Sequence, residues 1–365
     1  MSDQPLISVI IPVRNRPRLL RECIYSVLSQ DFPSWEAIIV DDGSEDETPA
    51  VIREFANKEP RIVPCATKCS ARGVTAARAL GFSASRAPYI MYVDSDDLLA
   101  PFSLGLRYEA IEKHPDVDGV VFQVESFRNT PGDNPGFSAI RRLLLEKVDP
   151  LEGFLAHLDP WYVASVLFRR EVLSRFGGWS ATVNLRVDSQ FYIRCLVEGV
   201  RFYCEPIVDY FCRDHHGERV SNLNSLAGID ILKQVYRAIF SVLLEHSLLD
   251  ARKRKLLAGA IFWDAVHMAK RRSVFALSSP DSSPLLTLLT ELSLVPPSSM
   301  PLLRFALFLQ RIPLLSLAGR ECLRLPWLNY VKRRSIFQPA VLSYSFQRLL
   351  LRLGINLGVL SASSK

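Results

Sequence analysis

The sequence predicts an α/β fold, with a largely parallel β-sheet flanked by helices and an α-helical region towards the C-terminus. Three observations lead to this prediction. In the first hundred residues, short β-branched runs alternate with segments whose apolar residues recur at helical spacing, which is typical of βαβ units. From about residue 221 onward the pattern is helical. The 365 residues, 48% of them hydrophobic, are enough for a large core.

Four strands are expected in the first hundred residues, with a helix between each pair. Continuous β-branched runs indicate strands that are buried on both faces. The expected strands are residues 6–13, 35–40, 61–65 and 89–93, and the expected helices are residues 16–29, 48–56 and 73–85. Further along, strands are expected at 117–124 and 200–210, helices at 170–176 and 188–198, and a loop at 129–137.

Charge divides the chain into two parts. Residues 1–224 contain 25 Lys and Arg against 31 Asp and Glu, whereas residues 225–365 contain 19 against 7. An acidic first part suits a site that recruits a cation, and a basic, apolar second part suits a surface that meets anions. We therefore expect a catalytic domain over 1–224 and a basic amphipathic helical region over 225–365.

The cysteines and the apolar segments indicate a cytoplasmic protein. The seven cysteines include no CxxC pair, which favours reduced, buried thiols. No signal peptide is recognised, because the apolar run 6–13 is short and arginines follow it. The most apolar long window, residues 302–318, is interrupted by arginines and a proline, so no membrane span is expected.

Two acidic clusters follow two of the expected buried strands. They are Asp41-Asp42 and Asp94-Ser95-Asp96-Asp97. Open α/β sheets bind ligands beyond the carboxyl ends of their strands, so these side chains are expected in one crevice. Carboxylates this close repel one another unless a cation joins them, and hard oxygen ligands favour Mg²⁺ or Mn²⁺. The alternative is that each cluster only caps the helix that follows.

The order of these signals resembles that of the family 2 glycosyltransferases with a GT-A fold. The matching segments are Pro12 at the end of the first strand, Asp41–Ser44, Gly73–Arg78 and the Asp94–Asp97 cluster. The resemblance covers residues 6–98 and recurs more loosely over 161–221. It implies an inverting transfer of a sugar from a nucleoside-diphosphate sugar, with a UDP-sugar favoured, to an acceptor hydroxyl. It also implies a nucleotide-sugar half over about 1–100 and an acceptor half over about 101–224.

The resemblance assigns the first group of site residues to the nucleotide. Pro12 and its neighbours, Arg14 among them, would line the nucleoside pocket, although Arg14 stands where the family often has an aromatic residue. Asp41 looks like the aspartate that hydrogen-bonds the base. Arg78 matches an arginine that helps to hold the nucleotide, and Ala79 replaces the asparagine that usually follows it.

The second group is implied to bind the diphosphate and to perform the chemistry. Asp94 and Asp96 match the family's DxD, which engages the ribose and a divalent metal, Mn²⁺ or Mg²⁺. Asp188, which follows Gly177-Gly178-Trp179, matches the base that deprotonates the acceptor. Val187 replaces the glutamate that precedes this base in the family, and the alternative for Asp188 is a helix N-cap. The segment 210–221 implies that Arg213, His215 and His216 neutralise the leaving group.

Two other functions remain open at this point. A nucleotidyltransferase shares the sheet and the carboxylate-bound Mg²⁺, but it usually has a glycine-rich loop after its first strand, where this chain has three arginines and no glycine. A catalytically silent nucleotide-sugar-binding module is the other, since Val187 and Ala79 depart from the family pattern. Nucleic acid is not expected as a partner.

The C-terminal helical region suggests where in the cell the protein acts. Residues 300–360 combine apolar helical faces with many arginines, a pattern that suits the surface of an anionic membrane. The alternative is a helical subdomain that packs on the catalytic domain. Because acceptors in the family are often lipid-linked, we expect a saccharide or lipid-linked acceptor and peripheral binding to the inner face of the plasma membrane.

Overall fold

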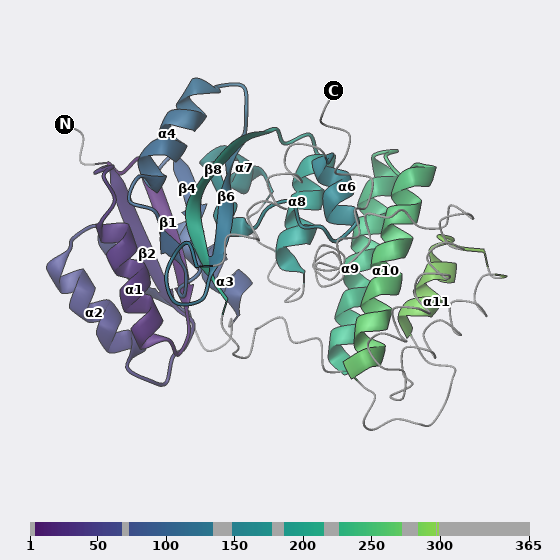
Figure 1. The fold of residues 1–365 in the computed structure, drawn as a ribbon, viewed down its shortest axis with the longest axis horizontal. Coiled ribbons are helices and arrows are strands. Elements are labelled where there is room, and N and C mark those ends of the chain that lie inside the picture. The colour runs from purple at the N-terminus through teal and green to yellow at the C-terminus, as the bar shows by residue number, and fades with distance from the viewer. Residues whose placement is uncertain are drawn as a thin grey trace. The chain divides into compact units, whose positions relative to one another are not determined.

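The computed structural model describes residues 4–67, 73–133, 148–176, 186–214, 226–271, 284–296 and 298. The chain divides into two compact units, Met1–Phe154 with Asp159–His246, and Leu155–Leu158 with Ser247–Lys365. The first unit contains the sheet, and the described part of the second contains two helices of the C-terminal region (Figure 1). The division of function at residue 224 stays a prediction.

The described part of the first unit is built on an eight-stranded sheet in the order β3-β2-β1-β4-β7-β6-β8-β5. The strands are β1 (Ile7–Val13), β2 (Trp35–Asp41), β3 (Ile62–Ala66), β4 (Tyr89–Tyr92), β5 (Leu98–Leu99), β6 (Gly119–Phe127), β7 (Val166–Arg169) and β8 (Phe202–Arg213). Only β7 and β5 run against the others among these strands. The prediction of a mostly parallel sheet flanked by helices is confirmed.

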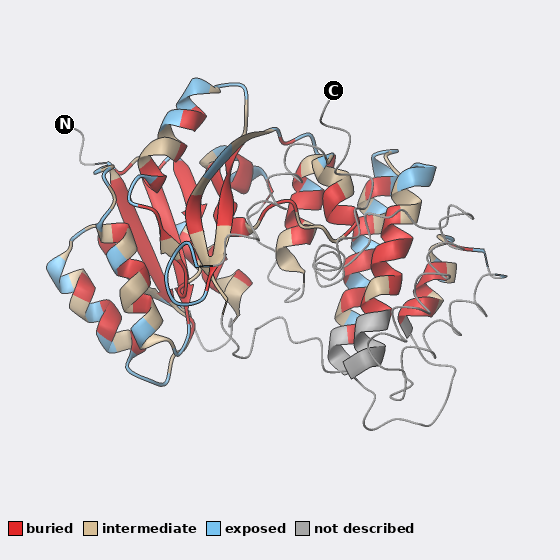
Figure 2. Ribbon diagram, in the orientation of Figure 1, coloured by how far each residue is buried: buried red, intermediate tan, exposed pale blue. Residues whose placement is uncertain are grey.

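Helices lie on both faces of this sheet. They are α1 (Pro17–Leu28), α2 (Thr48–Lys58), α3 (Val74–Ala84), α4 (Ser103–Lys113), α6 (Pro150–Leu155), α7 (Arg170–Arg175) and α8 (Val187–Val197). Val9 and Ile11 of β1 join a core with Leu20 of α1, whereas Ile10 points to the other face and meets α3. β1 is buried on both faces, as Figure 2 shows, and its sequence is apolar except for Ser8, whose hydroxyl donates to Glu36 at 2.7 Å.

A buried ion pair fixes β8 against α4. The Nη2 atom of Arg107 lies 2.7 Å from Oδ1 of Asp209, and its Nη1 atom donates to the backbone oxygen of Ala164 at 3.0 Å. Ser103 donates a further hydrogen bond to Asp209 at 2.8 Å. Removing one partner would leave the other as a buried charge without a counter-ion, so this pair fixes the position of β8. Neither α4 nor the two antiparallel strands, β5 and β7, is predicted from the sequence.

Three described helices belong to the C-terminal region: α9 (Leu226–Glu245), α10 (Ala251–Arg271) and α11 (Pro284–Glu291). They confirm the predicted helical character over the described ranges 226–271 and 284–291. In the described ranges, no helix combines the length and the apolar character that crossing a membrane requires. The basic segment 300–360 lies outside the described residues. Cys23 and Cys195 are free, buried thiols.

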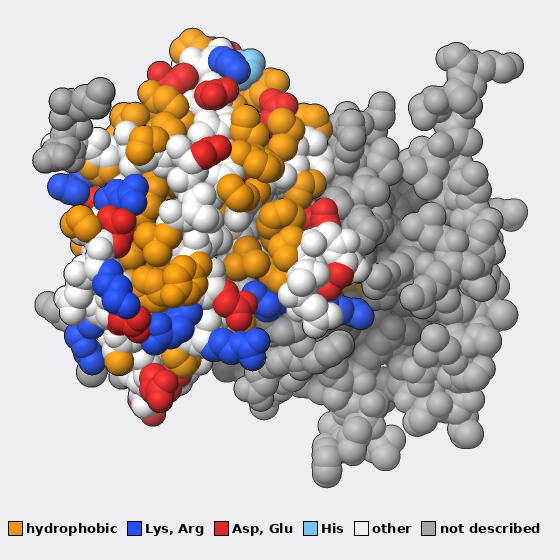
Figure 3. All heavy atoms as spheres, turned by 60° about the vertical axis from the view of Figure 1, so that its left-hand side comes forward, with side chains coloured by type: hydrophobic (Ala, Val, Ile, Leu, Met, Phe, Trp, Pro, Cys, Tyr) orange, Lys and Arg blue, Asp and Glu red, His pale blue; other side chains and the backbone are white. Residues whose placement is uncertain are grey.

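One face of the first unit carries an apolar area with charges around it (Figure 3). Lys and Arg side chains are interspersed with Asp and Glu on this face. Tyr25 and Phe102 are among the large apolar side chains that stay exposed, at 60% and 40%. Scattered exposed apolar residues are ordinary for a folded domain.

Candidate active site

The carboxyl ends of β1, β2 and β4 meet at one edge of the sheet. Val13 at the end of β1 is in register with Asp41 at the end of β2, and Ile10 is in register with Tyr92 at the end of β4. The backbone N–H of Asp42 donates to the oxygen of Val13 at 2.8 Å. Both acidic clusters therefore start at the same edge, from the two strands β2 and β4 that flank β1, as the sequence predicts.

The two aspartates of the first cluster differ in their contacts. Asp41 is half-buried, and its Oδ1 accepts a hydrogen bond from the Ser44 N–H at 2.9 Å. Asp42 is buried and accepts from the Thr67 hydroxyl at 3.0 Å and from the N–H of Gly73 at 2.9 Å. The left-handed φ of 115° at Gly73 suits glycine. Asp42 therefore anchors the start of α3 and leaves Asp41 at the rim of the crevice.

The second cluster forms an acidic loop after β4, in which Asp96 and Asp97 are buried and the Asp94 side chain is 45% exposed. Burial, together with the charges of Asp96 and Asp188, raises the pKa of Asp94 against the opposing effect of Arg78. Burial and the charges of Asp94 and Asp96 raise the pKa of Asp97 well above its ordinary value. The carboxylates of the loop therefore repel one another.

Arg78 joins this loop to the predicted base. Its Nη1 donates to Oδ1 of Asp188 at 2.8 Å, and its Nη2 lies 3.3 Å from Oδ1 of Asp94. The Arg78 side chain is 5% exposed. Burial alone would lower the pKa of Arg78, but Asp188 and Asp94 outweigh burial and raise it. The guanidinium is thus a fixed cation between two carboxylates.

Asp188 occupies the first turn of α8. The N-cap of that helix is Arg186, and no side-chain cap hydrogen bond forms there. Helix capping therefore does not explain Asp188, whose carboxylate is instead directed to Arg78. The Asp188 side chain remains 35% exposed, so a substrate hydroxyl has access to it. Its role as base stays a prediction, and residues 177–179 lie outside the described ranges.

A second arginine contacts the acidic loop from the start of α1. The Nη1 atom of Arg16 pairs with Oδ2 of Asp96, and the two side chains are 28% and 12% exposed. Sequence reasoning did not single out Arg16. Its position directly after the first strand, at the same edge as the acidic clusters, is the signal that could have indicated it.

Tyr210 and Arg213 of β8 hold the acidic loop in place. The Tyr210 hydroxyl accepts from the Asp94 N–H at 3.2 Å and donates to Oδ2 of Asp97 at 2.7 Å. Arg213 donates its backbone N–H to Asp97 at 2.8 Å and its Nε to the backbone oxygen of Asp96 at 2.9 Å. Tyr210 is the first residue of the segment 210–221 that resembles the family, but the sequence assigns its hydroxyl no role, although a buried tyrosine in an apolar strand usually has a partner for its hydroxyl.

The structure gives Arg213 a different environment from the predicted one. Its Nη2 lies 2.6 Å from Oε2 of Glu22, and its guanidinium lies 4.5 Å from the centre of the Phe127 ring. The side chain is 12% exposed. These contacts favour a positioning role, and neutralisation of the leaving group stays a prediction. His215 and His216 lie outside the described residues.

Pro12 and Arg14 flank the same edge. Pro12 is buried in β1 in register with Val40, and Arg14 is exposed directly beyond the strand. Of the predicted residues that the structure describes, Asp94, Asp96, Asp188, Arg78 and Arg213 form one connected network. Pro12, Arg14 and Asp41 lie at the strand ends beside it.

The chemistry of the loop fits a divalent cation. Among the described residues, no group of three or more His, Cys, Asp or Glu is arranged as a metal site. Mg²⁺ is often held by one or two carboxylates, with substrate phosphates and water completing its shell. Asp94 and Asp96 provide hard oxygens, and a cation would relieve the repulsion that contributes to the raised pKa of Asp94.

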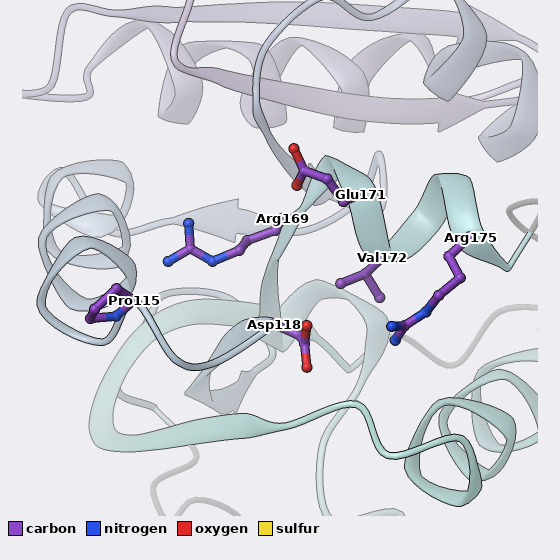
Figure 4. Close-up of a pocket in the computed structure, with 6 residues that line it drawn as sticks. All are labelled: Pro115, Asp118, Arg169, Glu171, Val172 and Arg175. Carbon is purple, nitrogen blue, oxygen red and sulfur yellow. The ribbon is translucent and has the colours of Figure 1, made fainter.

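A separate hollow of about 540 Å³ lies at the other end of the sheet (Figure 4). Its lining residues include Asp118, Arg169 and Arg175. Arg169 is in register with Tyr89, at the start of β4, whereas the acidic loop follows the end of that strand. The hollow lies apart from the predicted site, and its charges are of both signs.

Comparison with known proteins gives a family match. The profile of the family described as Glycosyl transferase family 2 matches residues 8–173. The chain is 31% identical over 200 residues to the uncharacterized glycosyltransferase EpsJ of Bacillus subtilis (strain 168), over 54% of this chain and 58% of that protein. It is 28% identical over 193 residues to the GalNAc(5)-diNAcBac-PP-undecaprenol beta-1,3-glucosyltransferase of Campylobacter jejuni subsp. jejuni serotype O:2. That match covers 52% of this chain and 62% of the relative, so the chain spans less than two thirds of either relative.

The fold is also similar to that of solved proteins. The crystal structure of S. aureus TarS 1-349 in complex with UDP-GlcNAc aligns with a TM-score of 0.60 and 18% identity, over 84% of this chain and 87% of that one. This likeness confirms the predicted GT-A fold class. The fold, the acidic loop and the matching profile agree, and the chain therefore carries a glycosyl transferase family 2 domain over residues 8–173.

Proposed function

We propose that the protein is an inverting, metal-dependent glycosyltransferase that moves a sugar from a nucleoside-diphosphate sugar to an acceptor hydroxyl. The observation that carries the proposal is the contact of Arg78 with both Asp188 and Asp94. It brings the predicted base next to the predicted diphosphate-binding loop. The two chemical requirements of the transfer, a proton acceptor and a site for the leaving group, thus meet at one place.

Each residue has a defined part in this mechanism. Asp94 and Asp96 would hold the divalent cation, which neutralises the diphosphate as the glycosidic bond breaks. Asp188 accepts the proton of the acceptor hydroxyl, and Arg78 orients its carboxylate. Attack from the face opposite the diphosphate inverts the anomeric carbon. Asp41, Pro12 and Arg14 would contact the nucleoside from the neighbouring strand ends.

The similar proteins suggest the classes of donor and acceptor. The TarS structure contains UDP-GlcNAc, which supports a UDP-sugar as donor. The name of the Campylobacter jejuni relative includes an undecaprenol-linked saccharide, which supports a lipid-linked acceptor. We therefore propose a role in the synthesis of cell-surface polysaccharide or glycolipid.

Location at a membrane surface is part of the proposal. The basic apolar segment 300–360 supports peripheral binding to the inner face of the plasma membrane, where a lipid-linked acceptor is found. Arginines at the head groups and apolar side chains below them would hold the enzyme there. The catalytic candidates all precede this segment in the sequence.

The product of the reaction tests this function against its alternatives. The purified protein is incubated with a panel of nucleotide-sugars, Mn²⁺ and saccharide acceptors. Release of nucleoside diphosphate supports glycosyl transfer. Formation of nucleotide-sugar from a sugar phosphate and a nucleoside triphosphate, with pyrophosphate released, would indicate a nucleotidyltransferase. Nucleotide-sugar binding without turnover would indicate the silent binding module.

A further inference from the structure

Arg78 and Arg16, whose guanidinium groups pair with carboxylates of the acidic loop, differ in how firmly they are held. Arg78 is 5% exposed and contacts two carboxylates. Arg16 is 28% exposed, and its guanidinium contacts Asp96. The backbone of Arg16 is fixed, because its N–H donates to Thr48 at 3.0 Å and its oxygen accepts from Leu20 at 3.0 Å. Only the long side chain of Arg16 is therefore left to move.

The contact of Arg16 falls on a residue that the proposed function gives to the metal. A guanidinium and a divalent cation compete for the same carboxylate oxygens, because each neutralises the same charge. Arg16 contacts Oδ2 of Asp96, so a metal that takes this oxygen must displace Arg16. The donor's diphosphate offers the displaced guanidinium a new partner, since arginine pairs well with phosphate oxygens.

We propose that Arg16 is an internal counter-ion that holds Asp96 in the free enzyme and moves to the donor's diphosphate when the metal binds. This inference rests on the proposed function. It makes metal and nucleotide binding cooperative: the metal binds weakly alone, because it must displace Arg16, and more tightly when a diphosphate receives that side chain. By linkage, each ligand raises the affinity for the other by the same factor.

The test measures Mn²⁺ binding directly, from the electron paramagnetic resonance signal of free Mn²⁺, with and without UDP. Arg16→Gln removes the competing charge and should bind Mn²⁺ alone about three- to tenfold more tightly than the wild type. The gain in Mn²⁺ affinity that UDP produces should shrink in this variant. Arg16→Lys keeps a cation and should restore weak binding of Mn²⁺ alone.

Arg18→Gln is the matched control. Arg18 lies in the same helix, is 91% exposed and pairs with Glu22, so its removal should leave Mn²⁺ binding at the wild-type level. Asp96→Asn should bind Mn²⁺ poorly in both conditions. A thermal melt of each variant confirms that it is folded.

Each other result has a distinct meaning. If Arg16→Gln binds Mn²⁺ alone no more tightly than the wild type while UDP promotes Mn²⁺ binding in both, the counter-ion role is wrong and the proposed function stands. If Arg16→Gln weakens UDP binding equally with and without Mn²⁺, Arg16 is a simple nucleotide ligand, and the inference fails. If the wild type binds no Mn²⁺ even with UDP, the metal dependence of the proposed function is wrong as well.

Discussion

Arg78 and Asp188 form an ion pair across 110 positions of sequence, with 2.8 Å between Nη1 and Oδ1. The arginine comes from α3, beside the nucleotide half of the domain, and the aspartate from the first turn of α8 in the acceptor half. The pair therefore connects the two predicted halves of the site. The guanidinium of Arg78 also contacts Asp94, so a substitution at either aspartate should alter the position of Arg78 and thereby its contact with the other aspartate.

The first prediction concerns the base. Asp188→Asn keeps an oxygen that accepts from Arg78 but loses the ability to take a proton, so transfer should fall by roughly two to four orders of magnitude. Donor binding should stay close to that of the wild type. Initial rates and nucleotide titrations measure the two effects separately.

Asp159→Asn is the matched control for this change. Asp159 accepts a hydrogen bond from Ser189, the residue next to Asp188, at 2.8 Å. The substitution makes the same change of charge near the start of α8. Transfer by this control should stay within about threefold of the wild type, since Asp159 is not the proton acceptor of the proposed mechanism. Equal losses in the two variants would show that α8 needs its negative charge for structure, and the base assignment would fail.

The second prediction concerns Tyr210. Tyr210→Phe removes the hydroxyl that accepts from the Asp94 N–H and donates to Asp97, so the acidic loop should lose its fixed position. Binding of UDP in the presence of Mn²⁺ should weaken about five- to tenfold, because the loop loses the two hydrogen bonds that fix its position. Calorimetric titration of UDP measures the change.

Tyr192→Phe controls for the loss of a buried hydroxyl. Tyr192 is also buried, and its hydroxyl donates to the Tyr162 oxygen at 3.2 Å, away from the acidic loop. Both variants should lose stability by about 1 kcal/mol. Unchanged UDP affinity in Tyr210→Phe would rule out a positioning role for that hydroxyl.

The third prediction tests the packing that positions Arg78. A Cβ at Gly81 of α3 would lie 2.3 Å from Cγ2 of Ile10, so Gly81→Ala should force α3 away from β1. The cost should be about 1–3 kcal/mol of unfolding free energy. Chemical denaturation measures it. Gly105→Ala in α4 meets only the movable side chains of Asp31 and Phe32, and it should stay within about 1 kcal/mol of the wild type. Equal effects would contradict the close approach.

Strand β2 belongs to the part of the fold that can be predicted from the sequence. The sequence predicts a strand over residues 35–40, and β2 spans Trp35–Asp41. The consecutive β-branched residues Ile38, Ile39 and Val40 favour a strand that is buried on both faces. By contrast, β7 pairs antiparallel with β4 and β6. That pairing joins segments far apart in the sequence, and no local pattern specifies it.

The features of the candidate site also fall into two groups: those that the local sequence predicts and those that depend on tertiary packing. Asp94 and Asp96 were predictable, because their position after a buried strand is a local property of the sequence. The contacts of Arg16 and Arg213 were not, because they depend on where β8 and α1 lie relative to the loop. The acidic residues can therefore be recognised from the sequence, whereas their contacts with the two arginines are known only from the packing of distant elements.

The fourth prediction concerns the basic segment 300–360. The full-length protein should float with anionic liposomes at low salt and less at high salt, because each basic residue near such a surface contributes about 1 kcal/mol. Replacing Lys332, Arg333 and Arg334 by Gln should reduce the bound fraction at a given lipid concentration. Equal recovery with neutral and anionic liposomes would contradict the role of these charges.

The central claim is that Asp94 and Asp96 hold a metal on which sugar transfer depends. The most direct measurement is the release of nucleoside diphosphate from a nucleotide-sugar in the presence of acceptor, with Mn²⁺, with excess chelator, and in the variant Asp96→Ala. The account predicts saturable release with Mn²⁺ that is lost in chelator, restored by added Mn²⁺, and absent in Asp96→Ala. Undiminished release in chelator, or full activity of Asp96→Ala, would contradict it.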